Sequence, residues 1–528
     1  MFCNQKIKER YVRSVTTSSI IMTDNLTSKT LHGLKWSYTG TIINSVLQIG
    51  FVAIMARLLE PTDFGMMAMV GVILRFGTYF AQMGVGSALI QKKQISDENV
   101  RASFTSAFLL GILFTIVVCL CAPLATYIFD NEKIVPIIRV MALSFFITGL
   151  STTAISLLRR NLAFRALAVT EIFSYVVGYG LIGILLAYNG FGVWSLVAGA
   201  LSQSAFLAIL SYLFCQHRLS FIFRWKYYKP LYSFGGRVSI ISFFEFLGSN
   251  LDTLAIGHFI GASPLGIYNR AFMLVNLPAQ YLTSSFSRVL FPSFSRVQKE
   301  ILRLKKAYLS TIMLFSAILL PACLGVAASS QEIVLLVLGE KWIAAIPVLK
   351  ILAIATPFNL LSHFGGIVCE ATATLNIKLL MQIIYVAILS ILFYLMRGLG
   401  IREFAVAIVF AEFIRYLAYL FIVKRICNIT PMEYVHAYLP PIVSSLVIGI
   451  SIYFVATILR GFNVHVFLLF AVELITGVGL LIVIFFYGPQ KTLREEIRNR
   501  FDKSGIKIKK NTVTDRLFCW FYKALSVN

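Results

Sequence analysis

Residues 51–65 read FVAIMARLLEPTDFG, and residues 252–266 read DTLAIGHFIGASPLG, so the second segment repeats the first. Each segment ends an apolar stretch in a short turn that contains proline and glycine, which stop a helix and allow a tight turn. Six expected membrane-crossing helices separate the two copies, so the repeat is parallel, with its axis along the membrane normal. The repeat predicts two homologous halves that form a site at their interface.

Apolar stretches long enough to cross a bilayer make up most of the chain. A spanning helix needs about 20 predominantly apolar residues, and the 528-residue sequence is 58% hydrophobic and 13% charged. With a mean hydropathy of +0.82, a soluble protein of this composition would aggregate. The expected spans are 34–56, 66–90, 102–129, 135–158, 166–187, 192–214, 232–258, 267–291, 307–328, 343–366, 379–396, 403–423, 436–457 and 465–487.

We therefore predict an all-α polytopic membrane protein of about 14 transmembrane helices. Two pseudo-symmetric six-helix lobes follow from the repeat, and two C-terminal helices remain. The connection between the lobes mixes basic and aromatic residues, which suits the lipid headgroup layer. The predicted segments are a cytoplasmic N-terminal segment 1–33, an N-lobe 34–214, an interfacial cytoplasmic linker 215–231, a C-lobe 232–423, the last two helices 424–487 and a basic cytoplasmic tail 488–528.

The positive charges fall in alternate gaps between the spans. The gaps after even-numbered spans hold 18 lysine and arginine residues, and the gaps after odd-numbered spans hold 6. The positive-inside rule then places both termini and the even-numbered gaps in the cytoplasm. The net charge of +24 thus reflects membrane topology and attraction to anionic membrane lipids, and we predict no nucleic-acid binding.

The sequence carries no pattern typical of an enzyme or a metal site. The eight cysteines show no metal-binding or disulfide spacing. No phosphate-binding glycine loop, pair of extramembrane carboxylates or histidine cluster is visible. We predict no catalytic residues, no metal and no cofactor. Residues 1–30 lack an apolar core, so we expect no cleavable signal peptide, and Met22 offers an alternative start.

Polar residues follow one face in each of four spans, and these spans are equivalent under the repeat. Side chains three and four positions apart lie on the same side of a helix. Turned toward each other, the four faces would enclose one hydrophilic cavity, although amide and hydroxyl groups also connect helices within membranes. The predicted substrate-binding residues are Asn44, Gln48, Arg75, Tyr79, Gln82, Arg237, Arg270, Asn276 and Gln280.

Charged groups inside these spans indicate what the cavity binds. Arg75 lies about nine residues from the end of its span, roughly 13 Å deep. Guanidinium groups match the geometry of pyrophosphate, so a cationic cavity indicates an anionic substrate. Glu245 and Asp252 lie about 10 Å apart along one helix. They either pair with Arg75 or Arg237, or they bind a coupling proton or sodium ion.

Four short motifs carry a family resemblance. They are GLKW at 33–36, ARLLEPTDFG at 56–65, NLDTLAIG at 250–257 with LGIYNRA at 265–271, and RVLFPSFSR at 288–296. In combination they resemble the bacterial polysaccharide transporter family, the Wzx-type flippases of the multidrug/oligosaccharidyl-lipid/polysaccharide (MOP) superfamily. The resemblance spans roughly residues 31–487, and His258 stands where the family pattern has arginine.

The resemblance implies a two-lobed bundle like that of the multidrug and toxin extruders (MATE). It implies a flippase of the bacterial inner membrane that moves an undecaprenyl-pyrophosphate-linked oligosaccharide from the cytoplasmic to the periplasmic leaflet by alternating access. Its product would serve O-antigen, capsule or exopolysaccharide assembly. An H+ or Na+ gradient would drive it, and a polysaccharide polymerase and a chain-length regulator are further candidate partners.

Two other functions stay open. A MATE-like ion-coupled exporter of small amphipathic compounds would need a cavity lined mainly by carboxylates, whereas the predicted cavity of this sequence is lined by arginines. A membrane-bound polysaccharide polymerase would need a large extracytoplasmic loop with catalytic residues, and the longest such gap, near 329–342, is short and mostly apolar.

Overall fold

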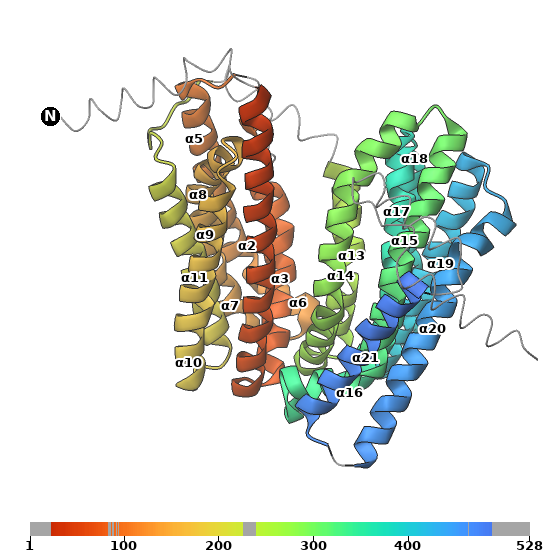
Figure 1. The fold of residues 1–528 in the computed structure, drawn as a ribbon. Coiled ribbons are helices and arrows are strands. Elements are labelled where there is room, and N and C mark those ends of the chain that lie inside the picture. Colours follow the sequence, from red (N-terminus) through yellow and green to blue (C-terminus); the bar gives the residue numbers. More distant parts are fainter. Residues whose placement is uncertain are drawn as a thin grey trace, which may run out of the picture. The chain divides into compact units, whose positions relative to one another are not determined.

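A computed structural model describes residues 23–82, 86, 89–90, 92, 94–224, 239–462 and 464–487. Within these ranges the chain is helical and contains no strand, which confirms the expected all-α fold (Figure 1). The α-helices are α2 (Thr23–Leu58), α3 (Pro61–Gln82), α5 (Asp97–Cys121), α6 (Ala125–Phe129), α7 (Ile134–Met141), α8 (Leu143–Arg160), α9 (Phe164–Tyr175), α10 (Ile184–Tyr188), α11 (Val193–Phe214), α13 (Ser239–Phe259), α14 (Ala262–Val297), α15 (Ile301–Ala328), α16 (Ser330–Ile333), α17 (Ala345–Ala371), α18 (Leu375–Leu395), α19 (Ile401–Cys427), α20 (Pro431–Gly461) and α21 (Val466–Tyr487).

Eleven stretches of described residues are long and apolar enough to cross a bilayer. The other three expected spans, 66–90, 232–258 and 267–291, coincide with α3, α13 and α14, which are helical wherever they are described. The chain is a multi-pass membrane protein, and the count of fourteen spans stays a prediction. The three helices outside the eleven are among the four for which the sequence predicts a polar face, and the fourth, α2, is one of the eleven.

Three expected spans are interrupted helices, and in one of them, 135–158, the interruption is the single residue Ala142 between α7 and α8. The span 102–129 consists of α5, a 3-10 turn at Ala122–Leu124 and α6, and the turn holds Pro123, which has no backbone N–H to continue the helix. The span 166–187 consists of α9, a π-helical stretch at Val176–Gly183 and α10. There Gly178 approaches α11 so closely that a Cβ would lie 2.5 Å from the backbone nitrogen of Gln203.

The helices form two compact units. The first comprises the described residues within Met1–Met55, Ile73–Tyr127 and Asn131–Ser239. In this unit α5 packs along α8, and α11 packs on α8, α9 and the π-helical stretch. Glycines allow this packing, since a Cβ on Gly111 of α5 or on Gly149 of α8 would lie within 3 Å of a carbonyl oxygen on the facing helix.

The expected linker 215–231 is described as far as Arg224, and its first part is fixed to α5. The backbone N–H of Ile222 donates to the Thr105 hydroxyl at 3.1 Å, and Arg101 donates to the carbonyl of Phe221 at 3.3 Å. The ring of His217 packs between aromatic rings of α5 and α11, and this burial lowers the pKa of His217. The linker thus begins as part of the first unit.

The second unit comprises the described residues within Ala56–Val72, Ile128–Asp130 and Ile240–Asn528. Its core lies among α14, α15, α17, α19 and α20, where the rings of Phe315 and Phe364 meet edge to face at 4.5 Å. The stretch Ala56–Val72 lies in the sequence range expected for the first lobe, yet it makes its contacts within the second unit. The domain boundaries stay a prediction.

The two copies of the sequence repeat meet within the second unit. Pro61 and Ala262 are 201 residues apart, and so are Gly65 and Gly266. A Cβ on Gly65 would lie 1.7 Å from the carbonyl oxygen of Ala262, and a Cβ on Gly266 would lie 1.8 Å from that of Pro61. Each copy thus places the same glycine against the same backbone position of the other, which gives this contact a local two-fold relation.

A segment of the second unit, residues 334–342, holds the turn between α2 and α3; we call it the strap. It contains a π-helical turn, Val334–Leu338, and a 3-10 turn, Glu340–Trp342. The Trp342 indole donates to the carbonyl of Ala56 at 2.9 Å, and Arg57 donates to the carbonyl of Leu336 at 2.7 Å. Lys341 pairs with Glu60 at 2.8 Å. The turn is therefore tied to the second unit through both backbone and side chains.

Candidate functional site

A polar stripe follows one face of α13 and consists of Glu245, Gly248 and Asp252, at spacings of three and four residues. The side chain of Gln382 on α18 packs against Gly248. A Cβ at Gly248 would lie 2.2 Å from Nε2 of Gln382, so only glycine allows this approach. At the end of the stripe, the Tyr268 hydroxyl of α14 donates a 2.5 Å hydrogen bond to Oδ2 of Asp252. The predicted stripe therefore faces α18 and α14.

The ammonium group of Lys378 on α18 joins two carboxylates. Its Nζ lies 2.6 Å from Oε1 of Glu245 and 2.7 Å from Oε1 of Glu370 on α17. The side chain of Lys378 is 19% exposed, that of Glu245 42% and that of Glu370 33%, so the group is partly desolvated. When all three groups are ionised they carry one net negative charge, which attracts a further cation to this place.

A second ionic group lies further along the same face of α18. The hydroxyl of Tyr385 and the side-chain amide of Asn359 each donate a 2.8 Å hydrogen bond to Oε1 of Glu412 on α19. Arg415 pairs with the other carboxylate oxygen of Glu412 at 2.5 Å, and the Glu412 side chain is buried. Three donor groups on three helices thus compensate one buried charge, which makes this group a structural element of the unit.

Arg270 lies at the start of α14, beside the contact between the repeat copies. Its guanidinium carbon lies 4.6 Å from the centroid of the buried Phe64 ring, and its NH2 donates to Oδ1 of Asn269 at 2.7 Å. The Phe64 ring in turn packs edge to face on Trp342 of the strap. A cation over an aromatic face gains roughly 0.5–2 kcal/mol, so Arg270 is a preorganised positive charge.

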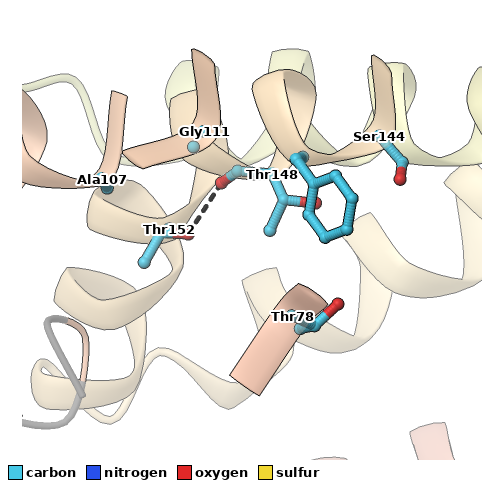
Figure 2. A pocket seen from close by; sticks show the side chains of 8 residues that line it. Thr78, Ala107, Gly111, Ser144, Thr148 and Thr152 are labelled. Atoms are coloured by element: carbon cyan, nitrogen blue, oxygen red, sulfur yellow. Dashed lines mark hydrogen bonds between the residues drawn. The ribbon is translucent and has the colours of Figure 1, made fainter. Parts of the chain in front are cut away.

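The first unit holds a small cavity between α3, α5 and α8, with a volume of about 40 Å³ (Figure 2). The hydroxyls of Thr78 and Thr152 reach it, but each donates to a carbonyl of its own helix. A single water needs roughly 10–15 Å³ of such volume, so the cavity is too small for a sugar. Its lining is Thr78, Ala107, Gly111, Ser144, Phe145, Thr148, Gly149 and Thr152.

The sequence of this chain matches the model of a known protein family. The model of the polysaccharide biosynthesis protein family matches residues 54–347, more than half of the chain. The chain is a member of the polysaccharide biosynthesis protein family. The matched range begins in α2 and ends in α17, so it includes the repeat contact, the strap and α13. The resemblance predicted from the four motifs is confirmed.

Three known proteins are similar to this chain at 25–26% sequence identity. An "uncharacterized membrane protein in cps region" of Klebsiella pneumoniae is 25% identical over 89% of this chain and 97% of that protein. The teichuronic acid biosynthesis protein TuaB of Bacillus subtilis is 26% identical over 66% of this chain and 72% of TuaB. The lipopolysaccharide biosynthesis protein WzxC of Escherichia coli is 26% identical over 67% of this chain and 72% of WzxC.

Two solved structures share the fold of this polysaccharide biosynthesis protein. The lipid II flippase MurJ in an inward closed conformation matches with a TM-score of 0.69 and 17% identity, over 88% of this chain and 99% of MurJ. An inward-facing MATE-family transporter of the MOP superfamily matches with a TM-score of 0.50 and 17% identity, over 74% of this chain and 94% of that chain. The predicted MATE-like fold is thereby confirmed.

The predicted cavity residues of the first unit lie on α2 and α3. Asn44 and Gln48 are half-buried on α2, and Arg75 is exposed on α3. The side chains of Tyr79 and Gln82, also on α3, lie outside the described part of the structure. These two residues and the cavity role of the other three stay predictions.

The predicted cavity residues of the second unit lie on α14. Arg270 and Asn276 are half-buried, and Gln280 is exposed. Arg237 precedes α13 and lies outside the described residues. The sequence predicts that Glu245 and Asp252 either pair with Arg75 or Arg237 or bind a coupling ion. Among the described residues, Lys378 pairs with Glu245 and Tyr268 donates to Asp252.

Lys378 contacts the carboxylates of this site but is not among the site residues predicted from the sequence. It precedes the expected span 379–396 by one residue, so it counts there as a topological charge in a cytoplasmic gap. The helix α18 begins at Leu375 and includes it. A usable signal exists, because Lys378, Gln382 and Tyr385 follow one another at spacings of four and three and so extend a polar face.

Proposed function

We propose that this protein is a flippase that moves an undecaprenyl-pyrophosphate-linked oligosaccharide from the cytoplasmic to the periplasmic leaflet of the bacterial inner membrane. The membership of residues 54–347 in the polysaccharide biosynthesis protein family carries this proposal. The names of the relatives support it, since they include a succinoglycan biosynthesis transport protein, ExoT of Rhizobium meliloti, which is 28% identical over 63% of this chain. The fold shared with a lipid II flippase supports the lipid-linked nature of the substrate.

The substrate would be held by its charge and its sugars. Arg75, Arg237 and Arg270 would bind the pyrophosphate, because guanidinium groups keep their charge in a partly dry site and donate two parallel hydrogen bonds to phosphate oxygens. The aromatic ring under Arg270 fixes the direction of that charge. The polar residues that would contact the glycan are Asn44, Gln48, Tyr79, Gln82, Asn276 and Gln280.

Alternating access would move the substrate without covalent chemistry, so the protein would not be an enzyme. Glu245 and Asp252 are the candidates for coupling to an H+ or Na+ gradient. Because Lys378 already occupies one oxygen of Glu245, a coupling cation at Glu245 would compete with this ammonium group. Such competition would link cation binding to the contact between α13 and α18.

The orientation and partners belong to the same proposal. The excess of lysine and arginine in the even-numbered gaps places both termini in the cytoplasm. A polysaccharide polymerase and a chain-length regulator would act on the flipped product, for O-antigen, capsule or exopolysaccharide assembly.

We expect Arg75→Ala to slow flipping of a fluorescent undecaprenyl-pyrophosphate oligosaccharide in reconstituted vesicles by about tenfold or more. The reason is the loss of a charge-assisted hydrogen bond, which contributes about 1.5–3 kcal/mol. The matched control is Arg139→Ala, which removes another exposed arginine of the first unit, on α7. An equal rate for the two variants would remove Arg75 from the site, and no flipping by the wild-type protein would overturn the function.

A MATE-like ion-coupled exporter of small amphipathic compounds is the second candidate. The fold match to a MATE-family transporter favours it. The same vesicles separate the two functions, because an exporter would accumulate a small organic cation and leave the labelled lipid in its original leaflet.

A further inference from the structure

An ion pair and an additional carboxylate meet where α16, α20 and α21 pack together. Arg460 of α20 donates from Nε to Oε1 of Glu332 at 2.8 Å and from NH2 to Oε2 at 2.7 Å. The Glu332 side chain on α16 is 3% exposed, so this bidentate pair neutralises a buried charge. Both oxygens of Glu332 are thereby occupied by one guanidinium group.

The additional carboxylate is Glu473 of α21, which is 1% exposed. Neither of its oxygens accepts a hydrogen bond of ordinary geometry from the described residues. The charged groups near it are Glu332, of the same sign, and Arg460, which already holds Glu332, and the nearby polar side chain is that of the buried Ser329. Two carboxylates thus share one guanidinium group in a buried place.

The packing of α21 shows that Glu473 points into the protein. Gly477 lies one turn further on the same face, and a Cβ there would lie 3.0 Å from Ile452 of α20. The neighbours of Glu473 in sequence, Leu474 and Ile475, are 56% and 72% exposed and form the opposite, lipid-type face. The carboxyl group is therefore turned away from the exposed face of α21 and toward α16 and α20.

A buried carboxylate is costly when the nearby hydroxyl, that of Ser329, makes no hydrogen bond of ordinary geometry to it and its counter-charge is shared with another carboxylate. A group in this position avoids the cost by becoming neutral. We propose that Glu473 is a proton-binding site, held as the neutral carboxylic acid beside the Glu332–Arg460 pair. A metal ion fits this place poorly, because the described residues contain no group of three or more side chains that could ligate one. The site involves neither Glu245 nor Asp252, and it does not depend on the identity of the transported substrate.

Protonation of Glu473 would affect the contacts of a neighbouring segment. The segment that carries Ser329 and Glu332 leads directly into the strap, whose carbonyl at Leu336 holds Arg57. Ionisation of Glu473 would add a second negative charge that competes with Glu332 for Arg460. Glu332, which this charge affects, lies four residues before Leu336, about one helical turn from a contact that fixes the turn between α2 and α3.

The test is infrared spectroscopy of the purified full-length protein at pH 7, in H2O and in D2O. We expect the wild-type protein to show a carbonyl band of a protonated carboxylic acid that shifts in D2O and is lost in Glu473→Gln. The matched control is Glu433→Gln, at the other end of α20, where the carboxylate pairs with Lys305 at 2.6 Å and gives no such band. A spectrum in which Glu473→Gln removes no protonated-carboxyl band overturns the proposal.

A stability measurement provides a second readout on the same variants. Glutamine has the shape and neutrality of the protonated acid, so Glu473→Gln should unfold at about the wild-type temperature near pH 4, where a glutamate is protonated in both the folded and the unfolded protein, and at a higher temperature than the wild type at pH 7. When the pH rises from about 5 to 7, the unfolded wild-type protein ionises this glutamate whereas the folded protein keeps the proton, so its unfolding temperature should fall relative to that of Glu473→Gln. Identical pH dependence of the two proteins would also overturn the proposal.

Discussion

Gly266→Ala is expected to lower the unfolding temperature of the protein by many degrees, or to prevent its recovery in folded form. The new methyl group would lie 1.8 Å from the carbonyl oxygen and 2.7 Å from the carbonyl carbon of Pro61. Overpacking typically costs about 1–3 kcal/mol, and here the obstacle is backbone, which no rotamer change can move. We expect a cost at or above the upper end of that range, measured by thermal unfolding of the detergent-solubilised protein.

The chain offers a matched control and an internal check for this prediction. Gly50 of α2 has open space around its Cβ position, so Gly50→Ala should leave stability unchanged or raise it, because alanine favours helices. Gly65→Ala should behave like Gly266→Ala, since a Cβ there would lie 1.7 Å from the carbonyl oxygen of Ala262. Once one substitution has separated the helices the second meets less resistance, so the double variant should lose less than the sum. A Gly266→Ala protein as stable as Gly50→Ala would contradict the reciprocal contact.

Lys378→Met is expected to destabilise the second unit by about 1–3 kcal/mol. The substitution keeps an unbranched side chain but leaves Glu245 and Glu370 facing each other without their cation. Breaking a fully buried ion pair costs about 3–5 kcal/mol, and the partial exposure of both carboxylates reduces this value through solvent screening. The measurement is the shift in thermal or denaturant unfolding relative to the wild-type protein.

The origin of this effect can be separated from lost packing. Lys378→Met combined with Glu245→Gln should recover much of the stability, because one of the repelling charges is then removed, and lower pH should do the same for the single variant. Lys378→Arg keeps the charge and should lose little. If the double variant is no more stable than Lys378→Met alone, the ammonium group does not stabilise the protein through its charge.

The helices could be predicted from hydropathy because lipid imposes a simple rule, that a crossing segment must be apolar and about 20 residues long. That rule says nothing about interruptions inside a span. The π-helical stretch Val176–Gly183 depends on how closely Gly178 approaches α11, which is a property of the packed structure. The same limit applies to the strap, whose contact with Ala56 joins residues 286 positions apart.

In the candidate site, too, the sequence predicts which residues share a helix face but not which helix they contact. The spacing of Glu245, Gly248 and Asp252 predicts a shared face on α13, and their contacts agree with that face. The partner of Glu245 could not be predicted, because the spacing along one helix does not reveal which helix lies opposite. Lys378 is 133 residues away in the sequence, and its position at the edge of an apolar stretch gives it the ordinary appearance of a cytoplasmic anchor.

The reciprocal glycine contact also constrains the order in which the chain can be completed during synthesis. Gly65 leaves the ribosome 201 residues before Gly266, a delay of roughly 10–40 s at about 5–20 residues per second. Until α14 is inserted, the turn between α2 and α3 lacks the backbone of Ala262 against which Gly65 packs. Folding therefore cannot finish half by half as translation proceeds, and the turn between α2 and α3 must stay without this contact until much of the later half has been made.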